Sequence, residues 1–125
     1  MAAIIIVDDS DALREVLAAV LVARGHDVTQ AGNGAEAKAL FADNSYDLAV
    51  FDIYMPDADG LALLTKLREQ GQTLPVIMMS GGRPGTPLEQ AVAIADAYGA
   101  DKVLFKPFGN QDLVDAVDEL LARQS

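Results

Sequence analysis

Short apolar segments alternate with segments of helical periodicity along the whole chain, and this alternation restricts the fold more than any other feature. Five segments are predicted as strands: residues 3–7, 26–31, 47–51, 75–79 and 102–105. The run at 3–7 is continuous and β-branched, which is typical of a strand buried on both faces. Because strands that alternate with helices form parallel sheets with right-handed crossovers, the sequence predicts an α/β fold with one five-stranded parallel sheet.

Helices are predicted between these strands from apolar spacing and from residues that favour helix ends. Ser10 is a suitable N-cap for the first helix, whose apolar residues continue to Leu21, and Gly25 marks its end. The other helices are predicted at residues 34–42, 61–67, 88–98 and 111–122. Residues 81–87 are rich in Gly and Pro and are predicted as a long loop, of a kind that is often functional.

The composition fits a single globular domain over residues 1–125, with no output domain expected after Ser125. Of the 125 residues, 51% are hydrophobic, 22% are charged and none is cysteine, which excludes disulfides and thiolate metal sites. The N-terminal residues lack the basic segment of a signal peptide, and no apolar stretch approaches the roughly 20 residues that span a bilayer, so a cytoplasmic protein is expected. The net charge of −10 argues against nucleic-acid binding.

Polar residues follow four of the predicted strands at the point where each strand ends. They are Asp8 and Asp9, Asp52, Ser80 and Lys106. The carboxyl ends of parallel strands meet at one edge of a sheet, and the first and third strands are expected neighbours, so the three aspartates should lie together. Three adjacent carboxylates repel each other, and a hard cation removes that penalty. The sequence therefore predicts a Mg²⁺ site with oxygen ligands.

The same residue types suit phosphoryl transfer to a carboxylate. An aspartate can act as the nucleophile and form an acyl phosphate. Such a reaction needs in-line positioning and neutralisation of the phosphoryl oxygens, for which the metal, the Ser80 hydroxyl and the Lys106 ammonium are the appropriate groups.

With these residues at its strand ends, the chain resembles a response-regulator receiver domain of two-component signalling, of the single-domain chemotaxis-regulator type. The resemblance covers nearly the whole chain, and its four motifs occur in order, each at a strand end. They are Ile6-Val7-Asp8-Asp9-Ser10, residues 52–60, Val76-Ile77-Met78-Met79-Ser80 and Lys106-Pro107-Phe108. The resemblance implies a doubly wound (βα)₅ fold with the flavodoxin-like strand order 2-1-3-4-5.

The resemblance also implies a role for each site residue. Asp52 resembles the phosphoacceptor, Asp9 the direct metal ligand and Asp8 the carboxylate that acts through a water. Tyr54 matches the position whose backbone carbonyl binds the metal.

Ser80 matches the switch hydroxyl of the family, and Lys106 matches the lysine whose bond to Pro107 is typically cis. The family acts as a signalling switch rather than as an enzyme with an external substrate. The implied phosphodonor is a sensor histidine kinase or a histidine phosphotransfer protein. The implied target binds the face formed by the fourth helix, fifth strand and fifth helix, and a homodimer through that face is compatible with the sequence.

Two departures from the family pattern concern the switch. The aromatic residue expected three positions before Lys106 is replaced by Val103, and Phe105 lies two positions further along the strand, so both side chains should face the same side. We predict that the usual aromatic rotamer switch is absent or altered. The loop 81–87 is longer than in the family, and we predict that it shifts on phosphorylation.

Two other functions are compatible with the same fold. One is an adaptor that binds partners without phosphorylation, although every key residue type of the acceptor site is present. The other is a flavodoxin-like cofactor binder, which fold analogy alone allows. Asp8 and Asp9 would repel the phosphate of a flavin nucleotide where that fold needs a hydroxyl-rich loop.

Overall fold

A computed structural model of the chain describes residues 2–53, 60–80 and 99–123. The strands are β1 (Ala3–Val7), β2 (Asp27–Ala31), β3 (Leu48–Asp52), β4 (Val76–Ser80) and β5 (Lys102–Phe105). The helices are α1 (Asp11–Ala23), α2 (Gly34–Asp43), α3 (Gly60–Glu69) and α5 (Asn110–Ala122). The predicted helix at 88–98 and the predicted loop at 81–87 lie outside the described residues.

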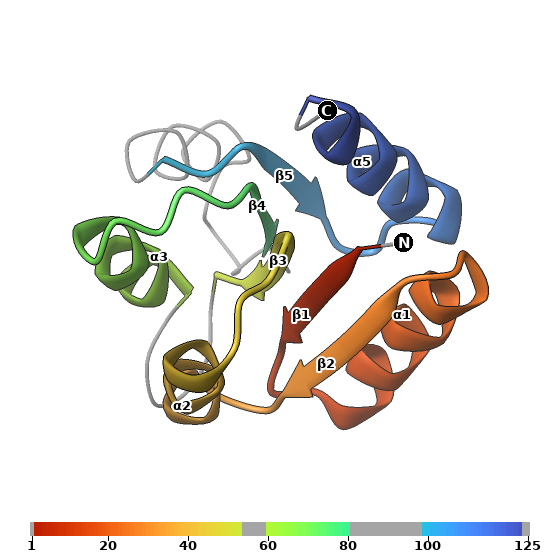
Figure 1. Cartoon of the computed structure of the whole chain (residues 1–125). Coiled ribbons are helices and arrows are strands. Elements are labelled where there is room, and N and C mark those ends of the chain that lie inside the picture. The colour runs from red at the N-terminus through yellow and green to blue at the C-terminus, as the bar shows by residue number, and fades with distance from the viewer. Residues whose placement is uncertain (1, 54–59, 81–98, 124–125) are drawn as a thin grey trace.

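All neighbouring strands are parallel, and their order is β2-β1-β3-β4-β5. The predicted α/β class and the strand order implied by the resemblance are therefore confirmed. Helices α1 and α5 cover one face of the sheet, and α2 and α3 cover the other (Figure 1). The sheet is thus the middle layer of three.

Strict alternation along the central strands divides the core between the two faces. One cluster joins the sheet to α2 and α3 and contains Ile5, Val7, Ala37, Phe41, Ala49, Phe51, Leu63, Leu64, Leu67, Val76 and Met78. The other joins the sheet to α1 and α5 and contains Ile4, Ile6, Leu17, Leu21, Leu48, Val50, Ile77, Met79, Leu113, Val117 and Leu120. Successive strand residues point to opposite faces, so a strand covered on both sides must be apolar throughout.

The helix ends follow the predicted local chemistry. The Ser10 hydroxyl accepts a hydrogen bond of 3.3 Å from the amide of Leu13, as an N-cap does. Gly25 has a φ of +90°, a conformation that residues with a Cβ rarely adopt. Helix α1 is therefore fixed at both ends, and its first turn lies directly after the end of β1.

Two strands are shifted by one residue from the prediction, and the shift affects the site. Strand β3 includes Asp52 because pairing continues past it, with the amide of Ile53 donating to the Met79 oxygen at 2.8 Å. Strand β4 begins after Pro75, which has no amide hydrogen to donate to a ladder, and ends at Ser80. Asp52 and Ser80 are thus the last residues of their strands rather than the first residues of loops.

No helix in the described part of the chain is both long and apolar enough to cross a bilayer.

The Phe51 side chain is a suitable test of the core beneath the site. It is fully buried on β3 and packs edge-on against Phe41 at 6.4 Å between ring centroids. We expect Phe51→Ala to lower the free energy of unfolding by about 3–5 kcal/mol, because it leaves a cavity between the sheet and α2. Urea unfolding measures the change. Val22→Ala, at a position 56% exposed, should cost less than about 0.5 kcal/mol, and equal losses in the two variants would contradict this assignment of the core.

Candidate functional site

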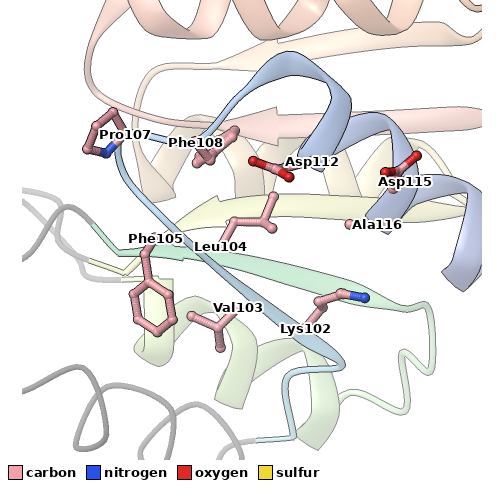
Figure 2. Close-up of a pocket in the computed structure, with 9 residues that line it drawn as sticks. All are labelled: Lys102, Val103, Leu104, Phe105, Pro107, Phe108, Asp112, Asp115 and Ala116. Atoms are coloured by element: carbon pink, nitrogen blue, oxygen red, sulfur yellow. The ribbon is translucent and has the colours of Figure 1, made fainter.

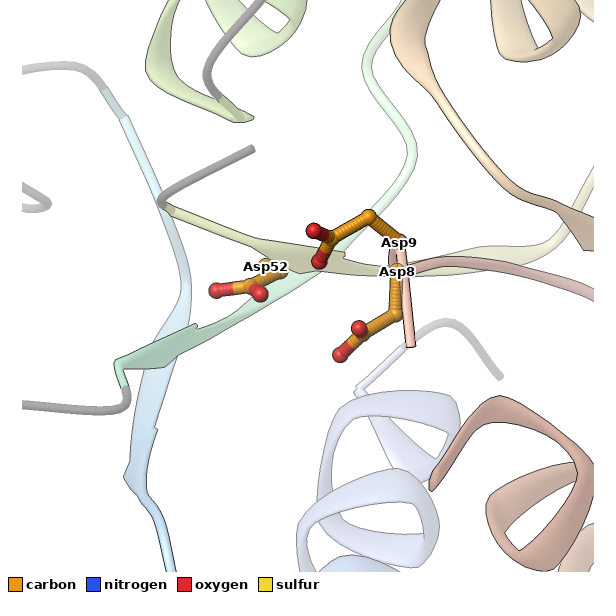
Figure 3. A group of neighbouring side chains, drawn as sticks. All are labelled: Asp8, Asp9 and Asp52. Atoms are coloured by element: carbon orange, nitrogen blue, oxygen red, sulfur yellow. The ribbon is translucent and has the colours of Figure 1, made fainter. Parts of the chain in front are cut away.

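The three predicted aspartates lie together at the carboxyl edge of the sheet, where β1 and β3 end (Figure 3). One carboxylate oxygen from each of Asp8, Asp9 and Asp52 lies within 4.8 Å of the other two. They meet because β1 and β3 are paired directly, with Val7 opposite Phe51. Asp8 is fully buried and Asp52 is 5% exposed, whereas Asp9 is exposed. The cluster is therefore open to solvent on the side of Asp9.

Lys106 supplies a positive charge to this cluster. Its Nζ donates to Asp8 Oδ2 at 2.9 Å and to Asp52 Oδ2 at 3.1 Å. Burial disfavours the charged ammonium, but the hydrogen bonds and negative charges of Asp8 and Asp52 outweigh it and raise the pKa of Lys106. Lys106 therefore stays charged at neutral pH.

Two further polar atoms of Asp8 are bonded to the backbone around it. Its Oδ1 accepts from the amide of Ser10 at 2.8 Å, and its own amide donates to the Ala31 oxygen at 3.2 Å. A buried carboxylate is tolerated only when its charge and lone pairs are satisfied, and Asp8 meets this condition with Lys106 and Ser10. Asp8 is thus a fixed part of the structure.

Ser80 lies at the same edge, on the strand next to β3. It is 3% exposed and is paired with Phe105 of β5, while Asp52 is paired with Met79, the residue before Ser80. The structure thus brings Asp8, Asp9, Asp52, Ser80 and Lys106 to one edge. The sixth predicted site residue lies outside the described part of the chain.

That sixth residue is Tyr54, so the expected metal bond from its carbonyl is not described. The Lys106–Pro107 peptide bond is described, and it is cis, as the resemblance implied.

The donor set fits a magnesium ion. Mg²⁺ binds hard oxygen ligands at about 2.1 Å, so two opposite ligands are about 4.2 Å apart. Carboxylate oxygens within 4.8 Å of one another need only a small adjustment to surround such an ion. The set contains oxygen donors alone, which a softer metal would not favour.

Residues 4–118 match the family profile of the response regulator receiver domain. This chain belongs to that family. Receiver domains are the switches of two-component phosphorelay signalling, and they bind Mg²⁺ through acidic residues. In this chain, Asp8, Asp9 and Asp52 form such an acidic cluster.

Similar proteins span this receiver domain almost completely. The receiver domain of the Francisella response regulator 1452 is 31% identical, with a TM-score of 0.90 and 100% coverage of both chains. A CheY-like receiver domain protein from Methanospirillum hungatei JF-1 is also 31% identical, with a TM-score of 0.89 over 99% of this chain and 96% of that one.

Among curated proteins, the response regulator MprA of Mycobacterium sp. (strain KMS) is 38% identical over 122 residues, which are 98% of this chain and 51% of MprA. The receiver domain thus spans about half the length of the curated relatives it matches.

Gly60 allows α3 to begin directly against the end of β3 in this receiver domain. Its amide donates to the Ile53 oxygen at 2.9 Å. A Cβ at this position would overlap the backbone oxygen of Asp52 and lie 2.9 Å from Met78 Cε. Any side chain at position 60 must therefore displace either α3 or the end of β3.

Two residues in this neighbourhood were not assigned a role from the sequence. Gly60 belongs to a quoted motif, but its close contact with Asp52 follows from the tertiary packing. Arg14 was not singled out at all, although it bonds to the backbone of Asp8. The sequence offers one indication of a role for Arg14: it lies five residues after Asp9, beside the apolar stripe of α1.

We expect Gly60→Ala to disturb the site itself as well as the fold. The new methyl group meets the Asp52 backbone, which cannot move without shifting the carboxylate. The expected result is a loss of about 2 kcal/mol in unfolding free energy, together with weaker Mg²⁺ binding by calorimetry. Ala62→Gly, two residues further along α3, is the control for helix propensity. Unchanged Mg²⁺ affinity in a folded Gly60→Ala protein would contradict the proposed close packing.

Lys106→Met should have opposite effects on the fold and on metal binding. Removing one partner of a buried ion pair leaves Asp8 uncompensated, so the metal-free protein should lose about 3 kcal/mol of stability. The same change frees two carboxylate oxygens and removes a repelling charge, so Mg²⁺ should bind more tightly and restore part of the loss. Thermal unfolding with and without Mg²⁺ measures both effects.

Lys38→Met, on the exposed surface of α2, is the matched control for Lys106→Met. A Lys106→Met protein as stable as this control in the absence of Mg²⁺ would contradict the structural role of the Lys106 bonds.

Proposed function

We propose that this receiver domain accepts a phosphoryl group on Asp52 in a Mg²⁺-dependent reaction and thereby switches a protein-binding surface. One observation carries the proposal: Asp52 is nearly buried beside two further carboxylates and 3.1 Å from the Lys106 ammonium. An acidic group held in this way has the charge partners that phosphoryl transfer requires.

In the proposed reaction, an Asp52 carboxylate oxygen attacks the phosphorus atom of a phosphohistidine on the donor protein. The new P–O bond forms as the P–N bond breaks, and the electron pair of that bond leaves with the imidazole nitrogen of the donor. The products are an acyl phosphate on Asp52 and an unphosphorylated histidine. The donor is a sensor histidine kinase or a histidine phosphotransfer protein.

The remaining site residues manage charge around Asp52. Bound Mg²⁺, held by Asp8, Asp9, Asp52 and the Tyr54 carbonyl, would supply neutralisation of the phosphoryl oxygens. The Lys106 ammonium already lies at Asp52 and can move its hydrogen bond from the carboxylate to a phosphoryl oxygen. The Ser80 hydroxyl, on the adjacent strand, is a donor for another of these oxygens.

We propose that the switched surface includes β5 and α5, together with the predicted helix at 88–98. A pocket of about 350 Å³ lies between β5 and α5 and is lined in part by Phe105, Phe108 and Ala116 (Figure 2). Phe105 and Pro107, the two chain neighbours of Lys106, line this pocket, which supports a link between the site and the surface. The expected partner is a downstream protein, and a homodimer through the same face is compatible with it.

Val103 and Phe105 point to the same side of β5, whereas Leu104 points to the other (Figure 2). This confirms the predicted orientation of the two side chains. Because position 103 is a valine, the proposed switch has no aromatic side chain there, and other side chains must move when the surface switches. A cytoplasmic location, where a kinase domain would meet the receiver domain, is part of the same proposal.

The proposal predicts that the protein gains one labile phosphoryl group when incubated with acetyl phosphate and Mg²⁺. Asp52→Asn should abolish the gain, because the carboxamide is a poor nucleophile, and chelation of the metal should abolish it in the wild type. Intact-protein mass spectrometry at neutral pH measures the adduct.

Asp43→Asn, at an exposed aspartate at the end of α2, is the control for the loss of one negative charge and should be phosphorylated like the wild type. A phosphoryl adduct that persists in Asp52→Asn would place the acceptor elsewhere. No adduct in the wild type would favour an adaptor that works without phosphorylation.

A further inference from the structure

The Arg14 side chain joins three segments next to the metal-binding acids. Its Nη1 donates to the backbone oxygen of Asp8 at 2.7 Å, and its Nε donates to Gln30 Oε1 of β2 at 3.2 Å. Its Nη2 donates to Asp11 Oδ1 at 2.6 Å. The guanidinium therefore connects the end of β1, the end of β2 and the first turn of α1.

These bonds do not resemble those of an ordinary surface ion pair. The Arg14 side chain is only 13% exposed, whereas its partner Asp11 is 81% exposed, so the charge pair alone contributes little. The guanidinium is a rigid planar fork, and three of its N–H groups point at three different acceptors at once. The shorter of its two bonds to groups outside its own helix is to the Asp8 oxygen.

The Asp8 oxygen belongs to the peptide unit that links the two acids. Because a peptide unit is planar, fixing this oxygen also fixes the amide of Asp9 and the direction of its Cα. The Asp9 carboxylate is exposed, and no hydrogen bond or ion pair holds it among the described residues. The position of the Asp9 Cα thus sets the point from which its side chain reaches toward Asp52.

We propose that Arg14 is a positioning residue for the metal site: by holding the Asp8–Asp9 peptide, it directs the Asp9 carboxylate toward Asp52. This inference rests on the proposed function, since it concerns the same Mg²⁺ site. Arg14 touches neither the metal nor the phosphoryl group, and it acts through the backbone. Its permanent positive charge also offsets part of the repulsion among the three acids.

The test compares Arg14→Gln with Arg24→Gln by calorimetric titration of the full chain with MgCl₂. Arg24 lies at the other end of α1 and makes an exposed ion pair with Asp118, so it controls for the loss of one positive charge. We expect Arg14→Gln to weaken Mg²⁺ binding about tenfold, as the loss of an outer-shell partner of metal ligands does. Arg24→Gln should bind Mg²⁺ like the wild type.

A merely structural role would give a different pattern. It would lower the unfolding temperature of metal-free Arg14→Gln and leave the Mg²⁺ dissociation constant of the folded protein unchanged, and this result would overturn the inference. Arg14→Lys separates geometry from charge. Lysine keeps the positive charge but lacks the planar fork of the guanidinium, so we expect Arg14→Lys to bind Mg²⁺ as weakly as Arg14→Gln does. Wild-type Mg²⁺ affinity in Arg14→Lys would overturn the positioning role.

If Arg14→Gln does not fold, Gln30→Ala tests the same inference without changing any charge. It removes one acceptor of the guanidinium from an exposed position on β2. Mg²⁺ binding should weaken by about threefold, in line with the loss of one hydrogen bond, and equal binding would overturn the inference.

The acetyl phosphate assay separates this inference from the proposed function. A wild-type chain that binds Mg²⁺ but gains no phosphoryl group would refute the proposed function and leave the role of Arg14 in metal binding intact. A wild-type chain that gains the group on Asp52 without measurable Mg²⁺ binding would refute the role of Arg14.

Discussion

The two hydrogen bonds from the Lys106 ammonium are the interaction on which the acidic edge of the sheet depends. Asp8 is fully buried and Asp52 nearly so, and each accepts one of these bonds. Without a cation, two adjacent buried carboxylates would repel each other and remain uncompensated. Lys106 compensates both carboxylates and holds them in place, so this cluster of acids can form before any metal binds.

The sheet topology explains why a lysine from the end of the chain reaches acids near its start. Asp8 follows β1, Asp52 ends β3, and Lys106 follows β5, so the three residues belong to different strands of one sheet. The amide of Lys106 donates to the Ser80 oxygen at 2.8 Å, which ties the residue after β5 to the end of β4. Strands β1, β3, β4 and β5 thus each place a site residue at the strand end or directly after it. The crossover helices pack on the faces and leave this edge accessible.

The sequence was sufficient for the parts of the fold that local chemistry decides. Apolar runs identified the five strands, Ser10 and Gly25 identified the ends of α1, and the polar residues after the strands indicated the site. The strand order could not be derived from periodicity and came from the resemblance. Strand ends were displaced by one residue at Asp52 because pairing with a neighbouring strand, which no local pattern reveals, decides where a strand stops.

The roles of Gly60 and Arg14 could not be predicted for a related reason. Glycine at the start of a helix and arginine beside an apolar stripe are both common, and neither indicates a site by itself. Their significance comes from two backbone oxygens, that of Asp52 against Gly60 and that of Asp8 against Arg14. Every residue has the same backbone oxygen, so the sequence does not indicate which of these oxygens a side chain will contact. Only the folded structure shows such contacts.

The two cations next to the acids differ in which atoms they bind, and this difference matches their proposed roles. Lys106 bonds to the carboxylate oxygens themselves, which are the atoms that a metal or a phosphoryl group must engage. Its bonds therefore have to be exchanged whenever the site is used, and a flexible side chain with a single charged atom suits that exchange. Arg14 bonds to a backbone oxygen that neither ligand needs. Its bonds can persist through the whole cycle, so the frame of the site stays fixed while the charges within it rearrange.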